Sequence, residues 1–269
     1  MAICSNSKVS AAIPTIGRTE TLSLVLYGLL AQTHRPKEVI ILDESERAVT
    51  EEPTVNQMLD LMSIEKIEVK IIRRRHRQGI GAARILLAQE AKYDSVFMVD
   101  DDVVPRPRCL QELIDGAIHK RQDGVNWIVP HCFLISGTSK LDGYLDIPVS
   151  RQDPRVKKWV QRYPWFLPYF KYKEDIIERT SVAGTQAILW DKEVLLSEGL
   201  EVEKLGKLPR EDTYLTRITA PGLFVSQAEC DHFEHSSQIT RGQWESSMFY
   251  KLHEVIINKP EEFLELIGE

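Results

Sequence analysis

The sequence predicts an α/β fold, with a mostly parallel sheet and helices on both faces. Short apolar runs rich in β-branched residues alternate with amphipathic segments, the order that places parallel strands side by side. Two of these runs stop abruptly at carboxylates, Asp43 and Asp100. Ligands of open α/β sheets collect at the carboxyl ends of strands, so we expect a binding site at this edge.

The individual elements follow in order along the chain. Residues 9–13 form a β-type run that stops at Pro14, and residues 19–32 place leucine and valine on one helical face. The further elements expected are strand 39–42, helix 55–62, strand 67–72, helix 79–91, strand 96–100, helix 110–117, strand 127–135, strand 187–190 and helix 249–257.

Composition narrows the class of protein. The length of 269 residues favours one large domain, and the formal net charge of −6 argues against broad nucleic-acid binding. The local basic cluster 73–77 allows a pocket for a polyanionic small molecule. We expect a soluble, cytoplasmic protein, since no apolar run approaches the ~20 residues of a membrane span and no secretory signal is seen. The cysteines lack paired spacing and are expected to be free thiols: Cys4, Cys109, Cys132 and Cys230.

The most informative motif is the acidic triplet Asp100, Asp101 and Asp102, directly after an uncharged strand. Side chains alternate along an extended chain, so Asp100 and Asp102 are expected to point the same way and Asp101 elsewhere. A hard divalent cation would relieve the repulsion between the paired carboxylates. The triplet therefore predicts either a clamp for a metal that carries phosphates or an acidic turn that caps the next helix.

A series of motifs in order resembles the family 2 glycosyltransferases, which have the GT-A fold. The resemblance covers roughly residues 9–237. Two positions depart from the family pattern, because Glu44 stands where an aspartate is usual and Ile85 where an asparagine is common. The segments that carry the resemblance are 12–18, 29–33, 36–40, 43–45, 79–84, 100–102, 181–185, 209–213 and 230–236.

This resemblance implies a metal-dependent, inverting transfer of sugar from a UDP-sugar, or another nucleotide-sugar, to an acceptor hydroxyl on a carbohydrate or other molecule. Asp212 would be the general base and Glu211 would position the acceptor. Asp102, of the Asp-x-Asp motif, and His232 would hold Mn²⁺ or Mg²⁺. The residues implied in donor binding are Pro14, Thr15, Arg18, Asp43, Glu44, Arg84, Asp100 and Asp101.

The same resemblance divides the chain by function. Residues 1–125 would form the nucleotide-sugar-binding α/β half, residues 126–245 the acceptor-binding and catalytic half, and residues 246–269 a C-terminal helix. Between Asp153 and Tyr172 lies a stretch dense in aromatic residues and proline. It suits a wall of the acceptor pocket, since sugar rings stack on aromatic faces, or a second hydrophobic core.

Several alternatives stay open at this point. The enzyme could be a retaining transferase of the same fold, or a catalytically silent nucleotide-sugar-binding subunit. A nucleotidyltransferase is disfavoured, because no glycine- and arginine-rich phosphate loop occurs near the N-terminus. His235 competes with His232 for the metal, and Cys230 with both histidines could form a zinc site. Glu211 and Asp212 could simply begin a helix, and Arg84 could form a surface salt bridge.

Overall fold

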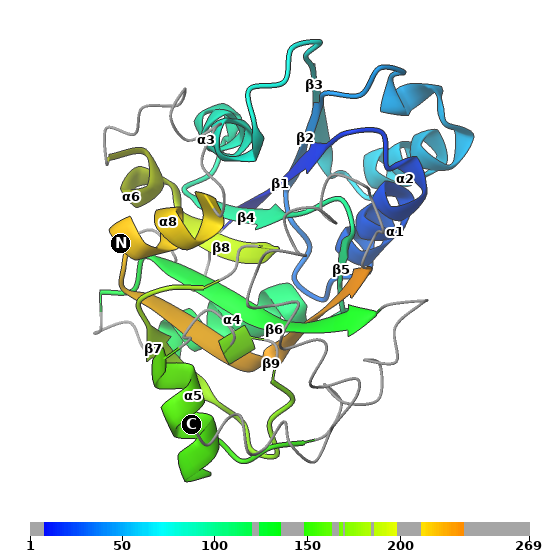
Figure 1. Ribbon diagram of the computed structural model, residues 1–269. Helices are drawn as coiled ribbons and strands as arrows, with labels where there is room; N and C mark the ends of the chain where they lie inside the picture. The colour runs from blue at the N-terminus through cyan, green and yellow to red at the C-terminus, as the bar shows by residue number, and fades with distance from the viewer. Residues whose placement is uncertain are drawn as a thin grey trace, which may run out of the picture.

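The computed structural model describes residues 8–119, 124–135, 148–162, 167–168, 170–183, 186–197 and 211–233. Its first half alternates strands and helices, and strands β1 to β4 run parallel to one another (Figure 1). The elements of this half are β1 (Val9–Thr15), α1 (Thr19–Leu30), β2 (Glu38–Asp43), η1 (Val49–Glu51), α2 (Pro53–Ile64), β3 (Glu68–Arg73), α3 (Ile80–Glu90), β4 (Ser95–Val99), β5 (Val103–Pro105) and α4 (Cys109–His119).

The second half adds strands of both directions to the same sheet. Strand β8 joins β4 antiparallel, and β9 runs parallel to β6 but antiparallel to β5 and β7. The sheet order is β3-β2-β1-β4-β8-β6-β9-β5, with β7 paired to β9. The elements of this half are β6 (Trp127–Ile135), α5 (Pro154–Arg162), β7 (Ile177–Thr180), β8 (Ala187–Asp191), α6 (Lys192–Ser197), α8 (Glu211–Ile218) and β9 (Gly222–Phe233).

Helices bury both faces of the sheet, as the sequence predicts. Alternate residues of β2 enter two separate cores: Val39 and Ile41 pack in one, Ile40 and Leu42 in the other. The first core receives side chains from α1, α2 and α4, and the second from α3, α5, α6 and α8. The expected α/β class is confirmed, and each predicted strand and helix of the first half lies within two or three residues of an observed one.

The aromatic stretch contributes several described side chains to the second core. Leu167 and Phe170 are buried there, and the ring of Tyr172 lies 5.8 Å from that of Phe224 on β9. The remaining aromatic side chains of the stretch, Trp165 among them, lie outside the described residues, as does the expected helix 249–257. The part that is described therefore favours the core interpretation over an acceptor wall.

No helix among the described residues is long and apolar enough to cross a membrane.

Candidate active site

The acidic triplet forms a tight turn at the carboxyl end of β4. The strand ends at Val99, and the turn closes by a 3.1 Å hydrogen bond from the Val103 N–H to the Asp100 carbonyl oxygen. The expectation that Asp100 and Asp102 share a side of an extended strand is therefore wrong. Alternation holds only for extended backbone, and the turn instead directs Asp101 and Asp102 toward one arginine and Asp100 toward another.

Asp101 and Asp102 face the loop between β1 and α1. Arg18 Nη1 lies 3.0 Å from Asp101 Oδ1 and 2.5 Å from Asp102 Oδ2. The Thr15 hydroxyl donates to Asp101 Oδ2 at 2.7 Å. The loop and the triplet, both predicted donor-binding segments, are thus brought together at one edge of the sheet.

Asp100 pairs with Arg84 of α3, at 2.9 Å between Asp100 Oδ1 and Arg84 Nη2. The Arg84 side chain is 3% exposed and that of Asp100 is 25% exposed, so the arginine is buried and the carboxylate is partly exposed. Desolvation raises the pKa of Asp100 to about 7; Arg84 opposes that rise, and Asp102 and Asp101 add to it. From the sequence, Arg84 was expected either to bind the donor or to form a surface salt bridge; in the structure it forms an ion pair with Asp100.

Asp102 also lies near His232, which β9 carries to the triplet. Asp102 Oδ1 is 3.7 Å from His232 Nε2, and the Phe233 N–H donates to the Asp102 carbonyl oxygen at 2.8 Å. A carboxylate beside an imidazole is a donor set that Mn²⁺ accepts, and Mg²⁺ commonly takes one or two carboxylates and completes its shell with water and substrate phosphates. Within the described ranges, no three His, Cys, Asp or Glu side chains are arranged to hold an ion. The pair therefore fits a metal that arrives with phosphate oxygens.

The two acids at the end of β2, Asp43 and Glu44, differ in whether their carboxylate oxygens can accept further hydrogen bonds. The buried Asp43 carboxylate accepts from the backbone N–H groups of Ser45 and Val49, each at 3.0 Å, and from Arg73 at 2.5 Å. Glu44 is also buried, and its Oε1 has no hydrogen-bond partner among the described residues. Burial raises the pKa of Glu44, while Arg74 and Arg77 oppose that rise. Of the two acids, Glu44 is therefore the one whose carboxylate can accept a further hydrogen bond, at Oε1.

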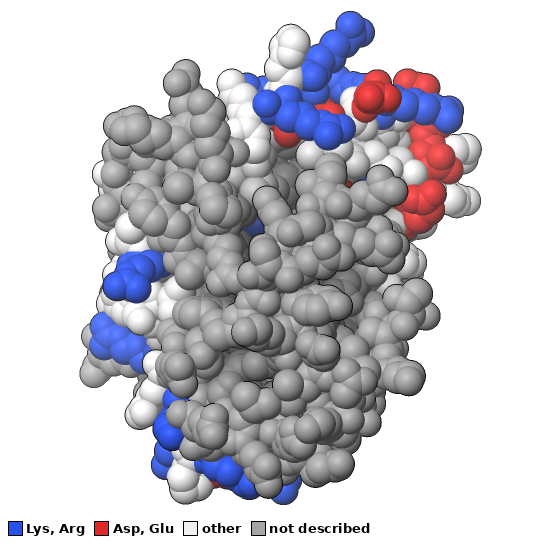
Figure 2. All heavy atoms as spheres, viewed as in Figure 1, with Lys and Arg blue, Asp and Glu red and all other residues white. Residues whose placement is uncertain are grey.

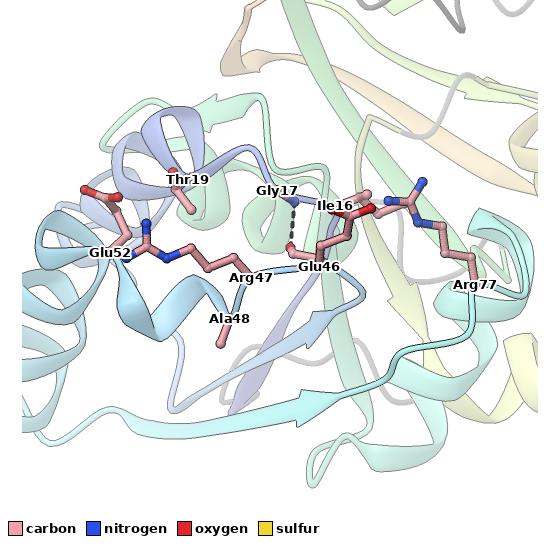
Figure 3. A pocket seen from close by; sticks show the side chains of 9 residues that line it. Ile16, Gly17, Thr19, Glu46, Arg47, Ala48, Glu52 and Arg77 are labelled. Atoms are coloured by element: carbon pink, nitrogen blue, oxygen red, sulfur yellow. Dashed lines mark hydrogen bonds between the residues drawn. The ribbon is translucent and has the colours of Figure 1, made fainter.

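A hollow of about 310 Å³ lies between the β1–α1 loop and the segment that follows β2. Figure 3 shows Ile16 and Glu46 on one side of it and the Arg77 side chain reaching in from the other. The Gly17 N–H donates to Ser45 Oγ at 2.6 Å and so ties the two walls together. Gly17 has a φ of +72°, which glycine adopts without strain.

Several residues that line this hollow were not singled out from the sequence. Arg77 belongs to the basic cluster 73–77, in which Arg73, Arg75, His76 and Arg77 are exposed. Lys and Arg side chains gather at the same end of the molecule, near β3 (Figure 2). The cluster was predicted to serve an anionic small molecule, but only the fold shows that Arg77 borders the hollow. Ile16, Gly17 and Ser45 lie within segments that carry the resemblance, and Glu46 and Arg47 directly follow one of them, but none of the five was assigned a role.

The remaining predicted site residues lie at a helix start and in a strand. Glu211 and Asp212 begin α8, and their side chains lie outside the described residues, as does His235. The helix itself is well anchored, because Thr216 Oγ1 donates to the Ala183 carbonyl oxygen at 3.1 Å and the Trp127 ring N–H donates to the Thr216 carbonyl oxygen at 3.1 Å. Pro14 is a buried residue of β1.

The three described cysteines, Cys109, Cys132 and Cys230, are free thiols and buried. Cys230 Sγ lies 3.4 Å from Cys109 Sγ, and burial raises the pKa of Cys230 well above its usual value. The spacing in sequence had not indicated that these thiols lie together.

Comparison with known families accounts for this arrangement of motifs. Residues 10–182, more than half of the chain, match the family described as glycosyl transferase family 2. The chain belongs to glycosyl transferase family 2. No curated sequence matches this family 2 protein.

Solved structures of low sequence identity share the GT-A fold with this family 2 protein. GalNAc-T7 with UDP, GalNAc and Mn²⁺ superposes with a TM-score of 0.62 at 16% identity, over 98% of this chain and 55% of that one. S. aureus TarS 1-349 with UDP gives 0.55 at 15% identity, over 97% and 69%. The complex of TarS 1-349 with UDP-GlcNAc gives 0.55 at 14%, over 97% and 70%. The chain spans about half the length of GalNAc-T7.

Proposed function

We propose that this protein is a metal-dependent, inverting glycosyltransferase that moves sugar from a UDP-sugar to an acceptor hydroxyl. The observation that carries the proposal is the meeting of Asp101, Asp102, Arg18 and His232 at the carboxyl edge of the sheet. Membership of family 2 supports the reaction type, and UDP in two of the similar structures supports the base. The hollow beside Arg77 is adjacent and large enough for a nucleoside.

On the donor side, the residues divide into binding and positioning roles. Glu44 would accept a hydrogen bond from the ring N–H of uracil, because both carboxylate oxygens of Asp43 already accept hydrogen bonds from Ser45, Val49 and Arg73. Asp43 would keep the loop after β2 in shape, together with Ser45 and Gly17. Arg84 would act through Asp100, which it holds at the mouth of the site.

Asp102 and His232 would hold Mn²⁺ or Mg²⁺, with the other coordination positions filled by the diphosphate and water. A divalent cation neutralises the charge that develops on the leaving diphosphate. Mn²⁺ in the GalNAc-T7 structure supports this choice of metal.

On the acceptor side, Asp212 would take the proton of the attacking hydroxyl, and Glu211 would position the acceptor. Both stand at the start of α8, where Thr216 and Trp127 fix the helix. A base on an anchored helix end is held steadily within reach of the proton it removes.

The test is transfer from UDP-sugars to a panel of sugar acceptors in the presence of Mn²⁺, with the anomeric configuration of the product read by NMR. Inversion of configuration is expected. Retention would contradict the role of Asp212 as the base, and the absence of both transfer and donor hydrolysis with every UDP-sugar would contradict the UDP-sugar donor.

A further inference from the structure

One cation of the chain already engages the carboxylates that would hold the metal. The Arg18 guanidinium contacts two acids through the same nitrogen, Nη1, at 3.0 Å from Asp101 Oδ1 and 2.5 Å from Asp102 Oδ2. The two carboxylates are 6% and 9% exposed, whereas the Arg18 side chain is 35% exposed. The acids are thus fixed in the protein and the arginine is the part that can leave.

The remaining oxygens of the two acids face different groups. Asp101 Oδ2 accepts from the Thr15 hydroxyl at 2.7 Å and from the Ile16 N–H at 3.4 Å, so Asp101 is held on both sides. Asp102 Oδ1 points to His232, at 3.7 Å from Nε2. A metal that binds Asp102 and His232 would therefore compete with Arg18 for one carboxylate, while Asp101 stays in place.

The charges at this edge make a free metal ion a poor competitor. Three carboxylates, of Asp100, Asp101 and Asp102, are opposed by two guanidinium groups, of Arg84 and Arg18. The two guanidinium groups thus already relieve most of the repulsion among the carboxylates, which would otherwise favour binding of a cation. A nucleoside diphosphate changes this balance, because its phosphate oxygens offer the arginine an alternative bidentate partner.

We infer that Arg18 is a latch on the metal site: it holds Asp102 until a diphosphate draws it away, so that metal and nucleotide bind together rather than the metal first. The inference rests on the proposed function, since it presumes a diphosphate donor. In this inference, Arg18 determines when the metal can bind Asp102, which an ion pair with only a structural role would not do. In the nucleotide complex, Arg18 contacts phosphate oxygens and Asp102 is released to the metal.

The test is calorimetric titration of Mn²⁺ into the full chain, with and without saturating UDP, for the wild type and four variants. R18Q removes the charge and keeps much of the side chain, and R18K restores the charge. R106Q is the matched control, because Arg106 also bridges two acids, Glu229 at 2.8 Å and Asp231 at 2.7 Å, and is 39% exposed. Melting curves establish that each variant is folded, and R18M is the second neutral variant.

In the wild type, UDP is expected to tighten Mn²⁺ binding strongly. In R18Q, Mn²⁺ alone should bind about tenfold more tightly than to the wild type, because charge-assisted hydrogen bonds to Asp102 no longer compete. The gain from UDP should shrink by a similar factor, while R18K and R106Q resemble the wild type. An R18Q affinity for Mn²⁺ alone within twofold of the wild type, with UDP binding retained, would overturn the latch and leave the proposed function standing. No binding of UDP to the wild type at any Mn²⁺ concentration would contradict both.

Discussion

The two halves of the sheet position their site residues by different means. In the half from β1 to β4, the polar side chains at the strand ends bind one another: Asp43 with Arg73, Asp100 with Arg84, and Asp101 and Asp102 with Arg18. In the half from β6 to β9, apolar packing fixes the backbone, and the rings of Trp127 and Trp190, both fully buried, lie 6.2 Å apart beside Gly222.

This difference suggests a division of labour. In the proposed function, the ion pairs at the ends of β1, β2 and β4 would keep charges close to the bound phosphates, and the pair of Arg18 with Asp102 would exchange partners when the diphosphate arrives. The half from β6 to β9 holds a helix start and the end of a strand at fixed places, through contacts such as the one between Thr216 and Ala183. Substitutions in the half from β1 to β4 should therefore weaken ligand binding. Substitutions in the half from β6 to β9 should lower the reaction rate or the stability.

The largest effect is expected from Asp212→Asn, which should lower turnover by about 10²- to 10⁴-fold and leave UDP affinity unchanged. Asparagine keeps the shape of the side chain but cannot accept the proton. Steady-state rates and calorimetry with UDP and Mn²⁺ measure the two quantities on the same preparation. A rate within a few-fold of the wild type would place the base elsewhere, and Glu211 would be the next residue to replace.

The next largest effect is a loss of stability when an atom is added to the closely packed half from β6 to β9, called the packed half below. A Cβ added to Gly222 would lie 2.1–2.2 Å from three atoms of the Trp127 ring, so Gly222→Ala should lower the free energy of unfolding by about 3 kcal/mol or more. Gly124→Ala is the control: Gly124 has a φ of +62° and open space around it, so only backbone strain of about 1–2 kcal/mol applies. The free energy of unfolding is measured in urea. If both variants lose the same amount, the contact between Gly222 and Trp127 can rearrange to accept the added Cβ.

A smaller effect concerns pH and a histidine in the packed half. His131 is 2% exposed and packs edge-on against Phe133; burial, with Arg106 and Lys171, lowers its pKa to about 3. The unfolded chain takes up this proton near pH 6.5 and the folded chain does not, so stability falls as the pH drops from about 6.5 toward about 3.

Between pH 6.5 and pH 5, the wild type should therefore lose about 2 kcal/mol more than His131→Gln. Urea unfolding at the two pH values gives the difference directly. If the variant has the same pH dependence as the wild type, His131 takes up its proton at about the same pH in the folded and unfolded chains, and the lowered pKa is contradicted.

The half from β1 to β4 could be predicted from the sequence because its signals are local. Strands β1, β2 and β4 are short, mostly apolar runs that are buried on both faces. A polar residue ends or directly follows each of them: Thr15, Asp43 and Asp100. The direction of the aspartates could not be predicted, because a turn between Asp100 and Val103 replaces the extended backbone. Nor could the partner of Asp101, since Arg18 lies 83 residues away in sequence.

The packed half was harder to predict because its pairings are distant and mixed. No local pattern indicates that β8 runs antiparallel to β4 or that β9 runs parallel to β6. The register shift between Pro130 and His131 also has no signature in periodicity. His232 was found only through the resemblance to a family, and its place beside Asp102 depends on the pairing of β5 with β9.

The most direct test of the central claim is stabilisation by UDP, measured by thermal and chemical unfolding with Mn²⁺ and with EDTA, in the wild type and in Asp102→Asn. With Mn²⁺, UDP at a hundred times its dissociation constant should stabilise the wild type by about 2.7 kcal/mol. With EDTA, the same UDP concentration should add much less, and Asp102→Asn should fold normally yet lose the metal-dependent part. Equal stabilisation with Mn²⁺ and with EDTA, or an unchanged response in Asp102→Asn, would contradict a donor site built on Asp102 and a divalent metal.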